Sequence, residues 1–481
     1  MSTFSGLNTA YTGLVAARKG LDVVGQNIAN ATTDGYTRQR VTTSSIGSPA
    51  RVGMFTTPLT VGQGVTVDGI ARLGDVFLDA RVRSSAASSG YWAARANVMT
   101  SLESTLREPG ENGLSNQLQE FWAGWQNVAN KAGDPAPAGV LLEEAGVLVS
   151  QIAAGYREVE GLWTQVRSEV NGMVSELNDA GAQVADLNAR IRSTLQAGGN
   201  INELLDKRST LTTSIASLAG GTARELEDGT MEVLIGGNAL VSGDIFRPVQ
   251  VAGANTMSEL NPAPPAPPQP VLLEWAHRPG SAVAMDGGNI GGALSTLAPA
   301  GIGPSAGTGG VLAEAAVSYN KFATDLATKV NLAHSGGFTA GGAAGGPFFA
   351  LDPNNPATTL SVVPTDASEI AASDGTGALS GLNADKVAQL GTGPDSPNNT
   401  WSDFVTSLGV TTRSNLQQAT LAGMATTSAV NMQLANASVD MDEENVNLLT
   451  FQVAYQGAAR VLTAVDEMLD TLINRTGIVG R

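Results

Sequence analysis

Both ends of this chain carry the same seven-residue apolar repeat, and this feature constrains the fold more than any other. A helix with one apolar stripe cannot bury that stripe alone, so we expect the two terminal helices to pack on each other as a coiled coil. The first helix is expected over 4–30. The stripe residues are Leu7, Leu14, Leu21 and Ile28 near the N-terminus, and Leu448, Phe451, Tyr455, Leu462, Val465, Leu469 and Leu472 near the C-terminus.

The charges of the two ends are complementary. Residues 1–51 contain five Arg or Lys and two Asp, a net charge of +3, whereas residues 437–481 contain seven acidic residues and three Arg, a net charge of −4. Asp440 and Glu443 have capping-box spacing and predict the start of the last helix. An ordinary bundle closed by its terminal helices would show the same pairing, because chain ends often lie close together. The pattern alone leaves that alternative open.

The first helix is expected to end in a turn. The segment 27–40 reads "NIANATTDGYTRQR", and its Asp34-Gly35 pair favours a turn because glycine readily adopts a positive φ. The β-branched residues over 37–45 predict an extended segment after the turn.

The middle of the chain predicts a helical rod with a β-rich insertion. Helical periodicity covers 91–108, 114–131 and 311–334, and a long run over 140–197 whose internal glycines weaken the expectation that it is unbroken. Over 222–285 the period changes to two, with a Gly-Gly-Asn hairpin signal. The Pro-rich segment 262–270 predicts a surface loop, and 335–400 predicts loops with short strands. Helix is expected again from 402 to the end.

The expected fold class is therefore mainly α with an inserted β-rich part. It combines paired N- and C-terminal helices, a long-helix bundle domain and a smaller β-rich outer domain. The expected domains are 1–45 and 438–481 for the two halves of the inner helical domain, 46–219 for the first part of the rod, 220–290 for the β-rich insertion and 291–437 for the returning helical part.

Composition argues against several classes of function. The net charge of −17 disfavours nucleic acid and anionic lipid as partners, and we find no run of about 18 apolar residues that would span a membrane. There are no cysteines, and the two histidines, His277 and His334, have no metal-ligand neighbours by spacing. No catalytic or phosphate-binding motif is present. We therefore expect no enzyme activity, no catalytic residues, no metal and no cofactor.

The turn resembles a family signature. The axial proteins of the bacterial flagellum, which form its rod, hook and hook-associated parts, carry the pattern Ala-Asn-x-x-Thr-x-Gly-Tyr near their N-terminus. The signature-turn residues here are Asn27, Asn30, Thr33, Gly35 and Tyr36. Asp34 stands where the family often has proline, which changes the stiffness of the turn but not its need for glycine.

The last helix resembles the C-terminal signature of the same family. The matching segment reads "DEENVNLLTFQVAYQGAARVLTAVDEMLDTLINR". One departure is that Gly457-Ala458-Ala459 stands where the family commonly has Ala-Asn-Ala. A polar stripe residue that could fix the register is therefore missing, and the register must be set elsewhere.

Within the family, the chain is most similar to the hook-associated members that join hook to filament. The resemblance implies a secreted, extracellular structural protein that is exported unfolded by the flagellar type III route. It implies self-association into a short ring-like layer whose terminal helices line the inner tube. The implied partners are the hook protein, a second hook-associated junction protein and a FlgN-like export chaperone. Candidate chaperone-binding residues are Asp442, Glu443, Asn447, Phe451 and Tyr455.

Two alternatives remain at this point. The chain could be another axial protein, either the second hook-associated protein or a hook protein, although a hook protein would be expected to lack the long 140–197 rod. Outside the family, it could be a secreted surface adhesin or enzyme built on a helical bundle.

Overall fold

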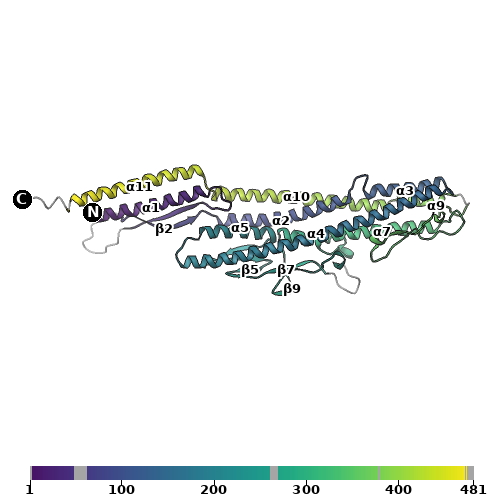
Figure 1. Cartoon of the computed structure of the whole chain (residues 1–481), viewed down its shortest axis with the longest axis horizontal. Coiled ribbons are helices and arrows are strands. Elements are labelled where there is room, and N and C mark those ends of the chain that lie inside the picture. Colours follow the sequence, from purple (N-terminus) through teal and green to yellow (C-terminus); the bar gives the residue numbers. More distant parts are fainter. Residues whose placement is uncertain (1–2, 48–61, 261–268, 377–379, 472, 474–481) are drawn as a thin grey trace, which may run out of the picture.

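The protein is a long rod, and the outer ends of its first and last helices lie at the same tip (Figure 1). The computed structural model describes residues 3–47, 62–260, 269–376, 380–471 and 473. We name the two parts of the rod the terminal pair and the body. The terminal pair contains the first and last helices and a β-hairpin, and the body contains the helices and strands between them. The mainly α fold class with a β-rich insertion is confirmed.

In the terminal pair, α1 (Thr3–Ala29) packs antiparallel on α11 (Met441–Asp470). The antiparallel strands β1 (Gln39–Ser45) and β2 (Val65–Arg72) lie beside α1. The predicted first helix and extended segment are therefore present. Because β2 pairs with β1, it belongs to the terminal pair, whereas the expected domain boundary after residue 45 places it in the rod.

A single long helix organises the body. α4 (Pro135–Gln196) has 62 residues and is about 93 Å long. Its internal glycines do not interrupt it, and at two of them, Gly155 and Gly181, neighbouring side chains occupy the space that a Cβ would take. A Cβ at Gly155 would lie 2.4 Å from the Tyr319 hydroxyl, and one at Gly181 would lie 2.7 Å from the Phe246 ring. Close packing thus compensates for the low helix propensity of glycine.

Seven further helices complete the described body. They are α2 (Val76–Leu106), α3 (Leu114–Asn130), α5 (Asn202–Ala219), α6 (Gly288–Leu297), α7 (Val311–Ser335), α9 (Leu382–Gln389) and α10 (Pro397–Ala437), with α8 (Pro356–Thr359) as a single short turn. Five of them, α2, α3, α5, α6 and α7, pack directly on α4. Three 3₁₀ turns occupy Met257–Leu260, Gly303–Ser305 and Ala367–Glu369.

The start of α2 differs from the expectation. The helix begins at Val76 rather than at 91, capped by Asp75, whose side chain accepts hydrogen bonds from the amides of Phe77 and Leu78. The segment 76–90 is rich in Ser and Ala and has little apolar periodicity, so its pattern did not indicate a helix. Tertiary contact holds it instead: a Cβ at Gly90 would lie 2.4 Å from the carbonyl oxygen of Ser217 in α5.

Two small antiparallel sheets form the β-rich part on one side of α4 (Figure 1). One has the order β3 (Thr222–Glu225), β4 (Met231–Ile235), β5 (Asn238–Ser242) and β6 (Ile245–Phe246), and the other β7 (Val249–Ala252), β8 (Leu272–Trp275) and β9 (Arg278–Ala282). The predicted Gly-Gly hairpin joins β4 to β5. Asn188 of α4 anchors the first sheet, because its amide donates to the carbonyls of Met231 and Gly243. Most of the Pro-rich segment lies outside the described residues.

The far end of the rod contains the loops that we expected over 335–400, with the short pair β10 (Phe349–Ala350) and β11 (Ser361–Val362). The helices α8 and α9 were not predicted there, and α10 begins at Pro397 rather than at 402. Ser396 caps α10 by accepting a hydrogen bond from the Asn399 amide.

By length and composition alone, α4 could cross a membrane. Its buried residues, including Leu141, Ile152, Trp163 and Leu177, instead form the core between the surrounding helices. The place of these residues in the hydrophobic core explains the apolar composition of α4.

Candidate assembly interface

The contacts between the two terminal helices recur every seven residues along each helix. A Cβ at Gly20 would lie 2.5 Å from the Phe451 ring, and Asn27 donates a hydrogen bond to Glu444. Asn27 is one heptad after Gly20, and Glu444 is one heptad before Phe451. The heptad pattern therefore runs in opposite directions along the two helices, and Gly20 provides the space for the largest side chain of the contact.

The predicted stripe residues are enclosed to different degrees. Val465 is buried, whereas Tyr455 is 37% exposed and Leu472 lies outside the described residues. On α1 the buried apolar side chains are smaller ones, namely Ala10, Ala17, Val23 and Val24. The remaining stripe residues are partly buried, namely Leu7, Leu14, Leu21, Ile28, Leu448, Phe451, Leu462 and Leu469. One helix facing another thus covers only part of each large stripe residue.

A buried asparagine fixes the register at the body-proximal end of the pair. The Asn27 amide donates to the Gln39 carbonyl at 2.9 Å and to Glu444 Oε2 at 3.2 Å. Its Oδ1 accepts from the Gln39 amide at 3.0 Å and from the Tyr36 hydroxyl at 2.9 Å. A slip along either helix would leave these buried groups unpaired, which is costly. Asn27 therefore supplies the polar register contact that the stripe itself lacks.

Arg38 joins the turn to the start of the last helix. Its guanidinium pairs with Glu443 and, at 2.7 Å, with Glu444, whose side chain is only 2% exposed. Burial would lower the pKa of Arg38, but the Glu443 hydrogen bond and the Glu444 charge outweigh it, so the pKa is raised. Glu443 is therefore used in an ion pair, while Asp440 alone provides the observed cap through the amides of Asp442 and Glu443.

The Arg38 backbone also ties together the two connections between the terminal pair and the body. Its amide donates to the Ala437 carbonyl at the end of α10, and its carbonyl accepts from the Leu73 amide, which follows β2. Both bonds are 2.9 Å long. The side chain and the backbone of Arg38 therefore both bind where the terminal pair joins the body.

The rest of the signature turn lies against the body. Gly35 has a φ of +77°, and a Cβ there would lie 2.7 Å from Thr210 Oγ1 of α5. Within the turn, Asn30 donates to the Gln26 carbonyl and Thr33 donates to Asn30. The turn therefore requires glycine for both its φ and its close approach to α5.

Burial and nearby carboxylates raise the pKa of Tyr36 to about 12, with Asp206, Glu444 and Glu203 as the contributing charges. The Tyr36 hydroxyl consequently stays protonated and continues to donate to Asn27 at ordinary pH. This keeps the register contact intact across that range.

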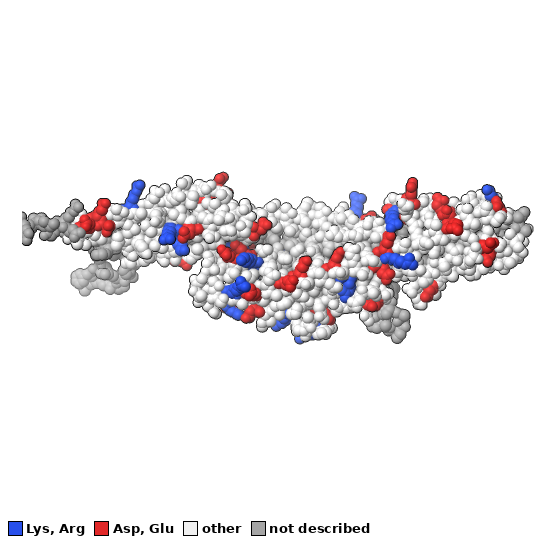
Figure 2. Space-filling view, viewed as in Figure 1, with Lys and Arg blue, Asp and Glu red and all other residues white. Residues whose placement is uncertain are grey.

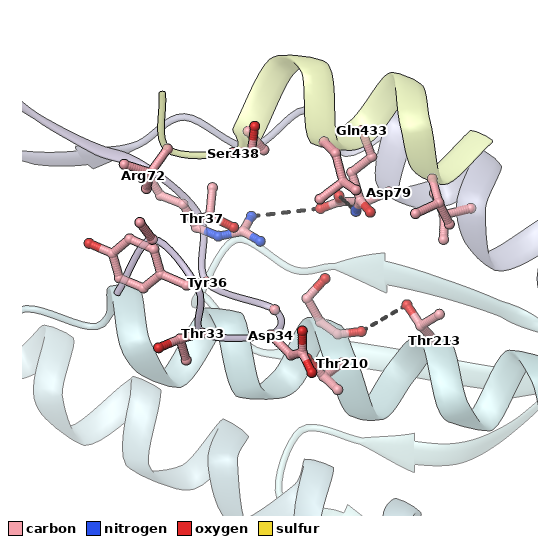
Figure 3. Close-up of a pocket in the computed structure, with 18 of the residues that line it drawn as sticks. Thr33, Asp34, Tyr36, Thr37, Arg72, Asp79, Thr210, Thr213, Gln433 and Ser438 are labelled. Atoms are coloured by element: carbon pink, nitrogen blue, oxygen red, sulfur yellow. Dashed lines mark hydrogen bonds and ion pairs between the residues drawn. The ribbon is translucent and has the colours of Figure 1, made fainter. Parts of the chain in front are cut away.

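Arg72 makes a second charged contact between hairpin and body. Its Nε lies 2.6 Å from Asp206 of α5 and its Nη1 lies 3.6 Å from Asp79 of α2. Gln433 of α10 donates to the same Asp79 at 2.6 Å. Arg72, Asp79 and Gln433 line a cavity of about 420 Å³ between the turn, α2, α5 and the end of α10, which we name the turn pocket (Figure 3).

The side of α11 opposite α1 is apolar as well. Val446, Val453 and Val461 are 63%, 68% and 49% exposed, and at about 100° per residue they lie across the helix from Leu448, Phe451 and Leu462. We name this set, with Leu449 and Met468, the outward face of α11. No charged residue occurs between Glu444 and Arg460, or over 414–439 in α10. Figure 2 shows an uncharged stretch of surface over α10.

The candidate chaperone-binding residues divide into two groups. Asp442, Glu443 and Tyr455 are exposed, although Glu443 pairs with Arg38. Asn447 and Phe451 instead border a small cavity with Gly20, Val24 and Val41 of the terminal pair. Asn447 and Phe451 are only partly exposed, so separation of α11 from α1 would uncover them further.

Neither histidine stands near a cluster of metal ligands. Among the described residues, no group of three or more His, Cys, Asp or Glu could hold a metal ion. His334 is buried, with Nδ1 2.8 Å from the Gly346 carbonyl and Nε2 accepting from the Ala371 amide. Burial lowers the pKa of His334, as expected for a neutral imidazole used as a structural connector.

Three family models match this chain. A model described as the flagellar hook-associated protein FlgK helical domain covers residues 99–349, more than half of the chain. A flagella basal body rod protein model covers 7–37, and a flagellar basal body rod FlgEFG protein C-terminal model covers 434–475. The two rod-type matches coincide with α1 plus its turn and with α11 plus the end of α10.

Similar proteins carry a matching description. The chain is 27% identical to flagellar hook-associated protein 1 of Bacillus subtilis, over all of both chains. It is 28% identical to the Escherichia coli protein of that name, over 76% of this chain and 65% of the other. The solved FlgK structure from Burkholderia pseudomallei matches with a TM-score of 0.61 at 14% identity, covering 73% of this chain and 99% of that one.

Proposed function

Because the chain belongs to the FlgK family and is a hook-associated junction protein of the bacterial flagellum, we propose that its terminal pair is the unit that assembles. Copies would form a short ring-like layer with α1 and α11 toward an inner tube. The stripe residues would hold the pair together, and the outward face of α11 would pack on neighbouring copies. The hook protein would contact one side of the layer, and a second hook-associated protein the other.

The outward face of α11 carries this proposal. Val453 and its neighbours leave most of their apolar surface uncovered by the described part of the chain. A contiguous exposed apolar face is typical of an interaction site. The absence of charge over 445–459 removes the desolvation cost that burial of ion pairs would add. The two faces of α11 together fit a helix that is meant to be surrounded by others.

A charge on the outward face tests the proposal. Val453→Asp changes a side chain that is 68% exposed, so the isolated protein should unfold at the same temperature as the unchanged chain. In cells lacking the protein, it should nevertheless fail to restore filaments, because an aspartate would be buried between copies. Filament counts by electron microscopy and swimming in soft agar give the readout.

Val140→Asp on α4 is the matched control, since Val140 is 56% exposed and lies far from the terminal pair. It should restore filaments. If Val453→Asp restores them equally well, the outward face is not an assembly surface and the proposal fails.

We also propose export to the cell exterior in an unfolded state, with a FlgN-like chaperone on α11 before export. The division of the candidate chaperone residues supports a chaperone that binds α11 detached from α1. Gly20→Leu, which would clash with Phe451, should therefore strengthen chaperone binding measured by calorimetry. Weaker binding would contradict this order of events.

A further inference from the structure

The start of α2 exposes a large aromatic side chain. Phe77 is 85% exposed, the highest value for a large hydrophobic residue in the described part of the chain, and Val76 beside it is 65% exposed. Arg81 lies one helical turn later on the same side and is also exposed. Within the described residues, Arg81 has no ion-pair or hydrogen-bond partner. The first two turns of α2 thus present an apolar knob next to a free cation.

The turn pocket opens on the other side of the same two turns. Asp79 and Val82 of α2 line the pocket, and Phe77 precedes Asp79 by two residues, which places it on the opposite side of the helix at about 100° per residue. The knob and the pocket therefore lie at the same level along the rod and point in opposite directions.

The pocket fits the knob in chemistry. Val430, Leu434 and Val82 supply apolar walls, and the volume of about 420 Å³ lies in the range that holds a compact apolar group. Asp34 also lines the pocket, is exposed, and has no ion-pair or hydrogen-bond partner for its carboxylate among the described residues. In Figure 3 it stands on the turn beside Thr210. A cation arriving with the knob would meet this carboxylate.

We propose that Phe77 of one copy enters the turn pocket of the next copy, and that its Arg81 pairs with Asp34 of that neighbour. The inference rests on the proposed function, because it specifies the contact between copies within the layer. A contact between two different surfaces of identical chains repeats from copy to copy and generates a ring or a helical row. Since both surfaces lie at one level of the rod, the row proceeds sideways, around the layer.

Cross-linking in assembled flagella tests the contact directly, because the chain contains no cysteine. Ser84→Cys beside the knob and Thr32→Cys on the pocket wall leave Phe77, Arg81 and Asp34 in place. Flagella isolated from cells carrying the double variant should give a ladder of multimers with a bismaleimide. Each single variant should stay monomeric, since the two surfaces differ. Thr32→Cys combined with Thr324→Cys on α7 is the control pair and should also stay monomeric.

The outcomes separate this inference from the proposed function. A double variant that is present in the isolated flagella but remains monomeric overturns the Phe77 contact alone. Absence of the unchanged chain from isolated flagella would instead overturn the proposed function.

A charge exchange gives an independent measurement. Arg81→Asp and Asp34→Arg should each reduce filament numbers, and the double exchange should restore them. A double exchange that is no better than either single variant overturns the ion pair.

Phe77→Ser should weaken association between copies about 30-fold, as for a central aromatic contact. Leu332→Ser, at a site that is 79% exposed, should have no effect, and equal effects of both serines would overturn the knob.

Discussion

The body and the terminal pair are built from similar helices but differ in how completely they enclose their apolar residues. In the body, Phe121, Trp125 and Phe322 have no exposed surface, and aromatic rings from three helices (α3, α7 and α10) and from β10 contact one another. In the terminal pair, most large stripe residues stay partly exposed, and α11 has a second apolar side without any partner in the described chain. The body encloses its apolar core, whereas the terminal pair leaves apolar surface uncovered, which is the surface that we propose packs on further copies.

This difference predicts that equal truncations have unequal costs. Phe121→Ala should lower the free energy of unfolding by about 3–5 kcal/mol, because it leaves a cavity among Trp122, Trp125 and Phe348. Leu462→Ala, at a partly exposed position, should cost clearly less in the isolated protein. Denaturant unfolding followed by tryptophan fluorescence and circular dichroism measures both. Equal costs would mean that the terminal pair is already a complete core.

A smaller effect is expected from the charged contact that replaces core packing in the terminal pair. Arg38→Met leaves the buried Glu444 without its cation and should cost about 2 kcal/mol of pairing between α1 and α11. Limited proteolysis should then release α11 faster while the body persists. Arg40→Met is the matched control, because Arg40 is exposed and makes no ion pair within the described residues. Similar cleavage of both variants would show that the Arg38 contact does not hold the pair.

The smallest expected effect is a pH dependence of stability that is confined to the body. Burial lowers the pKa of His334 below its ordinary value of 6.5, so the unfolded chain takes up this proton first. The contribution of neutral His334 is complete above about pH 6.5 and decreases as the pH falls toward the lowered pKa of the folded state. Acid should therefore loosen the far end of the body, seen as faster hydrogen exchange at the Ala371 amide. His334→Gln should remove this pH dependence, and its persistence would assign it to other groups.

The periodic elements could be predicted from sequence because their signals are local. The seven-residue apolar repeats predicted α1 and α11, and apolar residues three or four apart predicted α3 and α4. The change to a two-residue apolar period predicted the β4–β5 hairpin. The first part of α2 was missed because Ser and Ala carry no apolar period. Its helix depends on contacts with α5 and α10, to which the local sequence gives no clue.

The stripe was predicted more reliably than the contact that sets its register. The missing polar stripe residue correctly indicated that the register is fixed elsewhere, but Asn27 and Glu444 are separated by 417 positions, and no spacing rule connects them. Opposite net charges at the two ends were the only sequence signal for the Arg38 ion pairs. The turn pocket has walls from five separate segments and could not be derived from any one of them.

The hydrogen bonds of the Arg38 backbone have a mechanical consequence. The covalent path between the terminal pair and the body runs through two short connections, residues 73–75 and 438–440, which Arg38 bridges from either side. Covalent backbone cannot stretch, so the joint resists pulling. The ion pairs around it can break and re-form, so it yields to bending. Each copy would thus combine a stiff body with a joint that can bend.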